Sequence, residues 1–238
     1  TCGRPFLVEA GARVAPVIEG SEWLLDGPAE PRLDHLTLDE RRALAAHWQQ
    51  MGQLEHASIA AFARFSLQLL SLGAPPELVE SCTRALADET AHTKLCFRIA
   101  SAYAGCAVGP GRLDIDGSLG VTSLADVAEL VMIEGCFGET AAALDAFDAA
   151  NTATDPVIAR AYSTIAADEQ RHAELAFCFL RWALERGGAP VAARIAAVAA
   201  APPSSHQAAR AVTLPCLNAL LASHRAERGE QPTLIPTG

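Results

Sequence analysis

The chain has 238 residues, of which 50% are hydrophobic and 19% are charged. This composition can bury a full core and excludes intrinsic disorder as a description of the whole chain. The 18 basic residues against 28 acidic ones give a net charge of −10, without the clustered cations that a nucleic-acid partner requires. Charges, glycines and prolines interrupt every long apolar run, so the sequence predicts no membrane-spanning helix and no membrane partner.

The seven cysteines are scattered, odd in number and never spaced as C-x-x-C. This usage indicates reduced thiols rather than a disulfide framework or a cysteine-ligated metal, so a cytoplasmic location is expected. A lipidated Cys2, followed by Gly3, is the less favoured alternative.

The first 36 residues contain several prolines and glycines and no sustained helical period, which predicts an N-terminal arm. A capping box at residues 37–40 (Thr-Leu-Asp-Glu) opens a helix that runs to about Leu72. The sequence Gly-Ala-Pro-Pro at 73–76 ends this helix and starts a second one, which runs to about Ala104 and stops at Gly105.

A third helix is predicted from Ser123 to about Ala150, and Asp155-Pro156 starts a fourth that ends at Gly187-Gly188. Weaker helical patterns follow. The expected organisation is an N-terminal arm, a body of four long helices and a C-terminal helical extension packed on the body, at residues 1–36, 37–188 and 189–238, with the extension's helices near 190–200 and 205–226.

The lengths of the connections predict how these helices are arranged. Helices one and two, and helices three and four, are joined by a few residues, so each pair forms an antiparallel hairpin. The link between the pairs, residues 105–122, is about 17 residues long and can run the length of a helix. The expected fold is therefore all-α, a four-helix bundle with one long crossover.

A repeated motif carries the chemistry. The second and fourth helices contain Glu89-x-x-His92 and Glu169-x-x-His172, in which Glu and His lie on one helix face, one turn apart. Each preceding helix carries an isolated Glu in an apolar stretch, and the two isolated glutamates precede their motifs by closely matching offsets. The predicted set is Glu55, Glu89, His92, Glu134, Glu169 and His172.

Four carboxylates and two imidazoles in a bundle core suit two divalent ions, iron or manganese. Without ions, four ionised carboxylates in a low-dielectric core would repel one another and take up protons. Two divalent ions bring four positive charges and leave the site neutral. The sequence therefore predicts a di-metal centre.

The motif resembles that of the ferritin-like di-iron carboxylate superfamily, which includes ferritins, rubrerythrins and O₂-activating oxygenases and oxidases. The resemblance covers residues 37–188 and implies a ferritin-like bundle, two iron ions, with manganese in one position as the alternative, and the six residues above as ligands. In that family the residue before the motif Glu is often a supporting acid. The resemblance thus implies that Asp88 holds the free ring nitrogen of His172 and that Asp168 holds that of His92.

At some positions this chain differs from members of the family, and these differences narrow the range of expected reactions. Rubrerythrins place a further Glu three residues after the third-helix ligand, and this position is Phe137 here; ribonucleotide-reductase-like subunits place a radical tyrosine where this chain has Cys96. The first difference disfavours a peroxidase of the rubrerythrin type, and the second disfavours the storage of a tyrosyl radical. Cys96 is interpreted as packing, and His56 as a neighbour of the site rather than a seventh ligand.

The third helix contains two glycines, each costing about 1 kcal/mol relative to Ala in mid-helix. They predict either a cavity beside the metals or close helix packing, and both readings stay open. The residues expected to line such a pocket are Ile59, Cys96, Phe137 and Gly138.

The expected function is a non-haem di-iron oxidoreductase that uses O₂ and an electron donor to oxidise a small organic substrate. One alternative is a ferroxidase or peroxide-scavenging, iron-handling protein. Another is a helical scaffold that the metal only stabilises. For the C-terminal extension three roles stay open: capping the bundle, forming a homodimer, or roofing the pocket.

Overall fold

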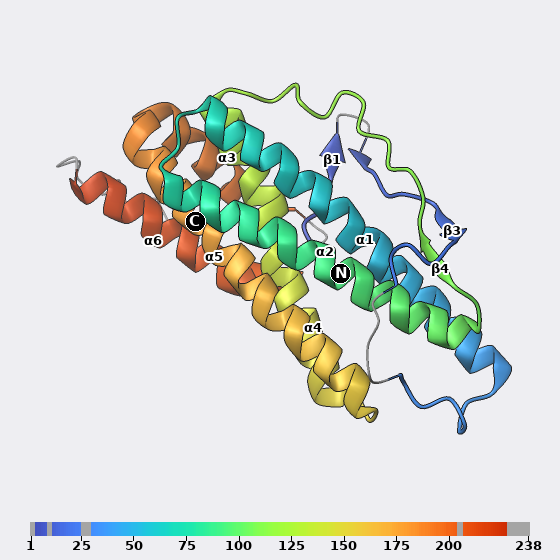
Figure 1. Ribbon diagram of the computed structural model, residues 1–238. Coiled ribbons are helices and arrows are strands. Elements are labelled where there is room, and N and C mark those ends of the chain that lie inside the picture. Colours follow the sequence, from blue (N-terminus) through green and yellow to red (C-terminus); the bar gives the residue numbers. More distant parts are fainter. Residues whose placement is uncertain (1–2, 9–10, 25–29, 204–206, 228–238) are drawn as a thin grey trace.

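The computed structural model describes residues 3–8, 11–24, 30–203 and 207–227, and it is mostly helical (Figure 1). The all-α class is therefore confirmed. The helices are α1 (Leu38–Ser71), α2 (Pro76–Ala104), α3 (Leu124–Val131), the π-helix η1 (Met132–Glu139), α4 (Thr140–Thr152), α5 (Pro156–Ala200) and α6 (Gln207–Glu227). Cys2, whose lipidation was left open, lies outside the described residues, as do parts of the arm and of the C-terminal extension. No helix within the described ranges is both long and apolar enough to cross a membrane.

The long helices begin and end at the predicted signals. The Thr37 hydroxyl accepts from the Glu40 amide (3.3 Å), while the Glu40 carboxylate accepts from the Thr37 amide (2.8 Å), so the capping box is present. Pro76 occupies the first turn of α2, and Gly105 ends this helix in the left-handed conformation (φ 74°). Asp155 caps α5 by accepting from the Val157 amide (2.8 Å).

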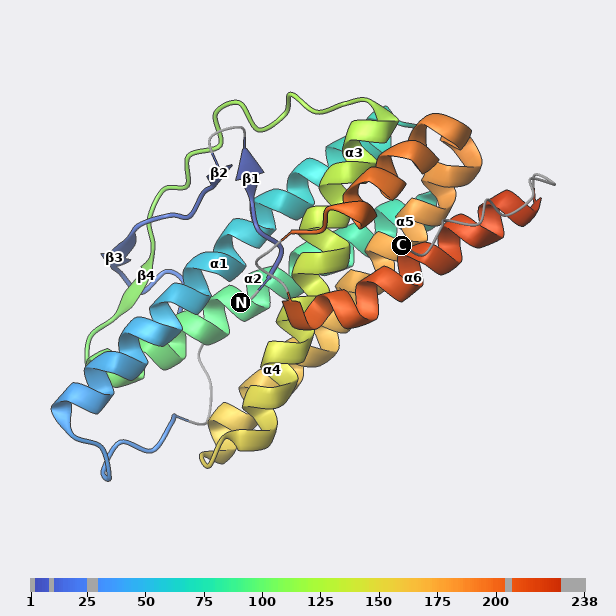
Figure 2. The same cartoon turned by 180° about the vertical axis from the view of Figure 1, so that it is seen from behind.

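The helices pack as two pairs. α1 lies along α2, and the consecutive segments α3, η1 and α4 lie along α5, with α2 against α5 between the pairs. α6 packs on α4, α5 and η1 (Figure 2). Residues 106–123 connect α2 to α3 by running back along α1 (Figure 1), which is the long crossover that the sequence predicts.

The N-terminal arm is tied to the crossover by strand pairing, which the sequence analysis did not predict. Strand β3 (Val17–Glu19) pairs antiparallel with β4 (Val108–Pro110) in the crossover. The strands β1 (Leu7–Val8) and β2 (Gly11–Ala12) form a second antiparallel pair within the arm. The arm is therefore joined to the crossover through the pairing of β3 with β4.

The chain turns sharply at Gly188, which has non-helical backbone angles (φ 55°, ψ −135°) inside α5, two residues before Pro190. This turn is the predicted end of the fourth helix, and the segment after it corresponds to the predicted helix at 190–200. The predicted helix at 205–226 corresponds to α6, whose described part begins at Gln207.

Two apolar cores leave a polar layer between them. Along α1, the core residues Trp48 and Phe62 lie on either side of Glu55, and all three are buried. Along α5, Ile165 and Phe179 flank Glu169 in the same way. The candidate site therefore lies in the middle of the helical body, away from both ends.

Candidate metal centre

Four glutamates and two histidines converge in this polar layer, and each is at most 2% exposed. They form two overlapping groups whose ligand atoms lie within 4.8 Å of one another. Glu89 and Glu169 belong to both groups. The first group is Glu55, Glu89, His92 and Glu169, and the second is Glu89, Glu139, Glu169 and His172.

Each of the two groups could hold a metal ion. Each contains one imidazole and one carboxylate of its own, together with the two shared carboxylates. A set of carboxylates with one nitrogen per ion suits iron or manganese better than a softer metal. The imidazole rings of His92 and His172 face the same region, with centroids 6.3 Å apart.

None of the inward-facing ligand atoms has a hydrogen-bond partner among the described residues. This holds for all eight carboxylate oxygens of Glu55, Glu89, Glu139 and Glu169 and for Nδ1 of both histidines. His172 Nδ1 lies 3.1 Å from a Glu89 oxygen, but not in hydrogen-bonding geometry. Native proteins leave only a few buried polar atoms without a partner. Ten such atoms in one place fit a group that could hold a metal ion.

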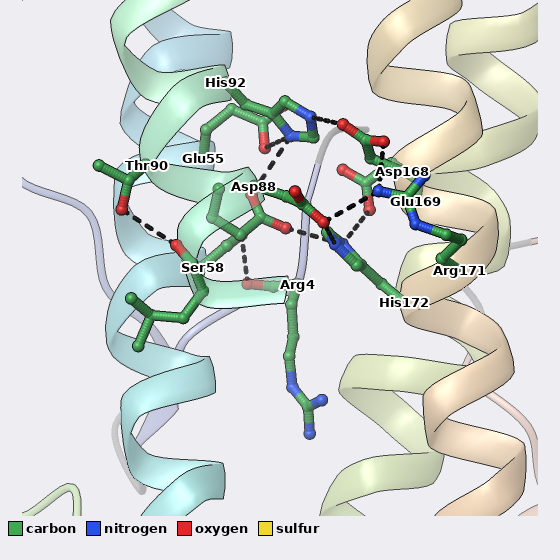
Figure 3. A network of polar contacts seen from close by, with 12 residues as sticks. Arg4, Glu55, Ser58, Asp88, Thr90, His92, Asp168, Glu169, Arg171 and His172 are labelled. Atoms are coloured by element: carbon green, nitrogen blue, oxygen red, sulfur yellow. Dashed lines mark hydrogen bonds and ion pairs between the residues drawn. The ribbon is translucent and has the colours of Figure 1, made fainter. Parts of the chain in front are cut away.

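The outer ring nitrogens are held by the two aspartates in the crossed arrangement (Figure 3). His92 Nε2 lies 2.9 Å from Asp168 Oδ2, and His172 Nε2 lies 3.3 Å from Asp88 Oδ2. Arg171 reaches both carboxylates, at 2.6 Å from Asp168 and 3.1 Å from Asp88. These contacts orient both imidazoles so that Nδ1 faces inward.

The metal-free cluster is electrostatically frustrated. Burial and the charge of Glu89 raise the pKa of Glu55 well above its ordinary value, and burial and Glu169 do the same for the pKa of Glu139. Burial opposes the ionisation of Glu89, but the two neighbouring imidazoles outweigh it and lower its pKa. Burial by itself would lower the pKa of His92. Contacts with Asp168 and the glutamates outweigh burial and raise this pKa well above the ordinary value.

The prediction that Glu134 belongs to the ligand set is corrected by the structure. Glu134 does not lie with the other five predicted ligands. Its carboxylate is fully buried but bonds to Arg4 Nε (3.3 Å), to the Leu7 amide (3.0 Å) and to Arg64. Glu139, five residues later, occupies the place in the cluster that the sequence analysis gave to Glu134.

The π-helix explains this exchange. In an α-helix, two residues five apart point about 140° away from each other, so they cannot both face the core side. In η1 the i→i+5 pattern brings such residues nearly above one another, and both Glu134 and Glu139 are buried. Glu139 is the last residue of η1, so its side chain enters the cluster where the chain returns to α-helix.

Glu139 lies at the same depth of its helical hairpin as Glu169. Glu139 precedes Ala153, where α4 ends, by the same number of residues by which Glu169 follows Asp155, where α5 begins. Residues equally far from a tight turn sit at the same depth of an antiparallel helix pair. Glu134 is further from this turn than Glu139, so it lies too far along the pair to meet Glu169.

The four pocket candidates lie in packed regions. Cys96 and Phe137 are fully buried in the apolar cores, and a Cβ on Gly138 would come within 3.0 Å of Pro5 Cδ. A Cβ on Gly135 would come within 2.6 Å of the Ala176 Cβ. The two glycines therefore serve close packing. None of the four pocket candidates lines either of the two cavities described below.

Two other cavities lie on the helical body. A cleft of about 680 Å³ between α2 and α5 is lined by Asp88, Arg171 and His172, so it reaches the imidazole side of the cluster. A groove of about 720 Å³ lies over α4, α5 and α6 and includes Thr140, the neighbour of Glu139.

His56 lies outside both groups, edge-to-face against Trp23, with ring centroids 5.1 Å apart. This position agrees with the expectation that His56 is not a seventh ligand.

Comparisons with known protein families, with curated proteins and with solved structures found no match to this chain. The class that the structure itself defines is a mostly helical protein with a buried Glu/His cluster that could bind metal.

Proposed function

We propose that the chain is a ferritin-like di-metal oxidoreductase in which α1, α2, α5 and the segment α3 to α4 form a four-helix bundle around two iron ions, with manganese as an alternative in one position. The observation that carries the proposal is the set of ten inward-facing ligand atoms without a hydrogen-bond partner. Their grouping, with Glu89 and Glu169 common to both halves, fits a pair of ions better than one.

Six residues would hold the ions. Glu55 and His92 would serve one ion and Glu139 and His172 the other, while Glu89 and Glu169, which belong to both groups, would serve either. When bound, the two ions supply redox chemistry with O₂ or a peroxide, which side chains of this kind cannot perform alone.

The remaining parts of the site prepare the ligands. Asp168 and Asp88 accept from the outer ring nitrogens and keep His92 and His172 turned inward. The apolar cores on both sides exclude bulk water from the carboxylates, which strengthens their attraction for cations. Arg171, 55% exposed, joins both aspartates at the mouth of the α2–α5 cleft.

The first candidate reaction is the O₂-dependent oxidation of a small organic substrate with electrons from a separate donor. The cleft that ends at Asp88 and His172 supports the approach of a donor or substrate to the imidazole side of the cluster.

A second candidate is favoured by the dense packing at Gly135 and Gly138. Ala176 and Pro5 fill the space beside these glycines. This dense packing favours small reactants over an organic substrate on the carboxylate side of the cluster. Oxidation of Fe²⁺ or removal of H₂O₂ would need no such room.

The test is the reaction of the iron-loaded protein with O₂. The chain is loaded anaerobically with Fe²⁺, mixed with O₂ and followed by stopped-flow absorption, with and without candidate organic substrates. A transient absorption that decays faster with a substrate supports the first reaction, and repeated turnover of added Fe²⁺ or H₂O₂ supports the second. Optical silence in a fully loaded protein would contradict both and indicate a metal-stabilised scaffold.

A further inference from the structure

Residues 3–8, here called the strap, lie between α1 and η1 and contact both. On the α1 side, the Ser58 hydroxyl donates to the Arg4 carbonyl (2.9 Å). On the η1 side, the Leu7 amide donates to the Glu134 carboxylate (3.0 Å), and Pro5 packs against Gly138. The strap thus joins two helical segments that carry cluster residues.

The strap delivers a buried positive charge to the π-helix. The Arg4 side chain is 1% exposed, and its Nε lies 3.3 Å from Glu134 Oε2. Its guanidinium carbon lies 5.0 Å and 4.6 Å from the ring centroids of Phe62 and Phe65, a geometry in which the ring faces attract the cation. Figure 3 shows this side chain directed away from the cluster.

Arg64 of α1 completes the surroundings of Glu134. It pairs with the other carboxylate oxygen, and it also donates to the Leu7 carbonyl. Both oxygens of Glu134 are therefore occupied by charged or amide donors, in contrast to Glu139, whose oxygens have no partner among the described residues.

This contrast decides which glutamate enters the cluster. A buried carboxylate is tolerated only with a compensating charge, and removing one member of a buried pair leaves the others uncompensated. If η1 adopted an α-helical register that turned Glu134 toward the cluster, Arg4 and Arg64 would lose their counter-charge. The ion pairs therefore favour the π-helical register, in which Glu139 faces the other cluster residues.

We infer that Arg4 is a positioning residue of the metal centre, which acts through Glu134 to fix the π-helical register that presents Glu139 to the second ion. The inference rests on the proposed metal centre. Because Glu139 belongs to only one of the two groups, the loss of Arg4 affects one ion more than the other.

The binding test is a titration of the metal-free full chain with Co²⁺ without O₂, followed by absorption and calorimetry. Wild type is expected to bind two ions. Arg4→Met weakens the binding of one of them about 10- to 100-fold, the range for the loss of a group that supports a ligand. Arg13→Met is the matched control, since Arg13 lies in the same arm but pairs with the Asp114 carboxylate and donates to the Asp116 carbonyl.

The rescue variant is Arg4→Lys, which restores a positive charge beside Glu134 and leaves the pair of Arg64 with Glu134 intact. This variant is expected to recover most of the affinity for the second ion. A purely structural role of Arg4 predicts no difference between Arg4→Lys and Arg4→Met, because the two side chains have similar bulk.

A second readout does not depend on metal. Hydrogen–deuterium exchange of the amides of residues 132–139 is measured in the metal-free protein. Exchange is expected to be faster in Arg4→Met and close to wild type in Arg4→Lys. If wild type bound no Co²⁺, the proposed metal centre would be wrong, and the exchange pattern would still decide the role of Arg4 in the helix register.

Three results would overturn the inference. These are wild-type affinity for both ions in Arg4→Met, an equal loss of both ions without rescue by Arg4→Lys, or unchanged exchange of residues 132–139 in Arg4→Met.

Discussion

Two glutamates five residues apart in η1 meet opposite surroundings. Glu134 is paired with two arginines, while Glu139 faces two other carboxylates and an imidazole. Five of the six cluster residues could be predicted, because Glu55 stands alone in an apolar stretch and the Glu-x-x-His motif has helical spacing. Glu139 could not be found by helical periodicity, because an α-helical period does not anticipate an inserted π-turn.

At the scale of single residues, we expect Glu139→Ala to reduce the metal content from two ions per chain to about one. The reason is that the second group loses its own carboxylate while the first keeps its full set. The measurement is metal analysis after loading with excess Fe²⁺ and desalting. His56→Ala is the control and keeps two ions, since His56 contacts Trp23 instead; unchanged metal content in Glu139→Ala would remove Glu139 from the ligand set.

At the scale of elements, the caps made the helix boundaries predictable, since each depends on residues close in sequence, such as Thr37 with Glu40. The strap was not predictable. Its contact between Arg4 and Glu134 spans 130 residues, and no local pattern indicates which distant carboxylate a buried arginine will meet. The pairing of β3 with β4 escaped for the same reason.

At the scale of elements, we predict that the close contact between η1 and α5 can be measured as a change in the free energy of unfolding. Gly135→Ala places a methyl group within 2.6 Å of the Ala176 Cβ on α5, and because neither backbone can move freely, this overpacking is expected to cost about 1–3 kcal/mol. Chemical denaturation of the metal-free protein measures it. Gly120→Ala, whose added Cβ meets nothing closer than 3.9 Å, is the matched control and changes the free energy of unfolding little. Equal effects of both variants would contradict the close contact between η1 and α5.

The C-terminal helix contributes to the same element. The Thr213 hydroxyl of α6 donates to the Cys136 carbonyl (3.0 Å) inside η1, so η1 is held by α6 as well as by α1 and the strap. Three roles were left open for the C-terminal extension. The contacts of α6 with α4, α5 and η1 fit the first of them, capping of the helical body.

At the scale of the whole molecule, the cluster makes stability depend on pH. Burial and Glu89 raise the pKa of Glu55, and burial and Glu169 raise that of Glu139, above the ordinary 4.5. Contacts with carboxylates, against the opposing effect of burial, raise the pKa values of His92 and His172 above 6.5. All four groups hold protons in the folded state that the unfolded chain has released, so their contribution to stability is lost as the pH rises.

The expected result is a lower melting temperature of the metal-free protein at pH 8 than at pH 6, by about 2–4 °C for each kcal/mol lost. The lowered pKa of Glu89 does not offset this, because it acts below pH 4.5. Circular dichroism with a chelator measures the effect, and added Co²⁺ weakens it because the ions replace the protons. A melting temperature that rises from pH 6 to pH 8 without metal would contradict this account of the cluster.

The measurement that tests the central claim most directly is anomalous X-ray diffraction from crystals of the iron-loaded chain, recorded on both sides of the iron absorption edge. The account predicts two peaks, one contacting Glu55 and His92 and the other Glu139 and His172, with Glu89 and Glu169 reaching both and Glu134 still paired with Arg4. No peak, a single peak, or Glu134 in place of Glu139 at the second ion would contradict it.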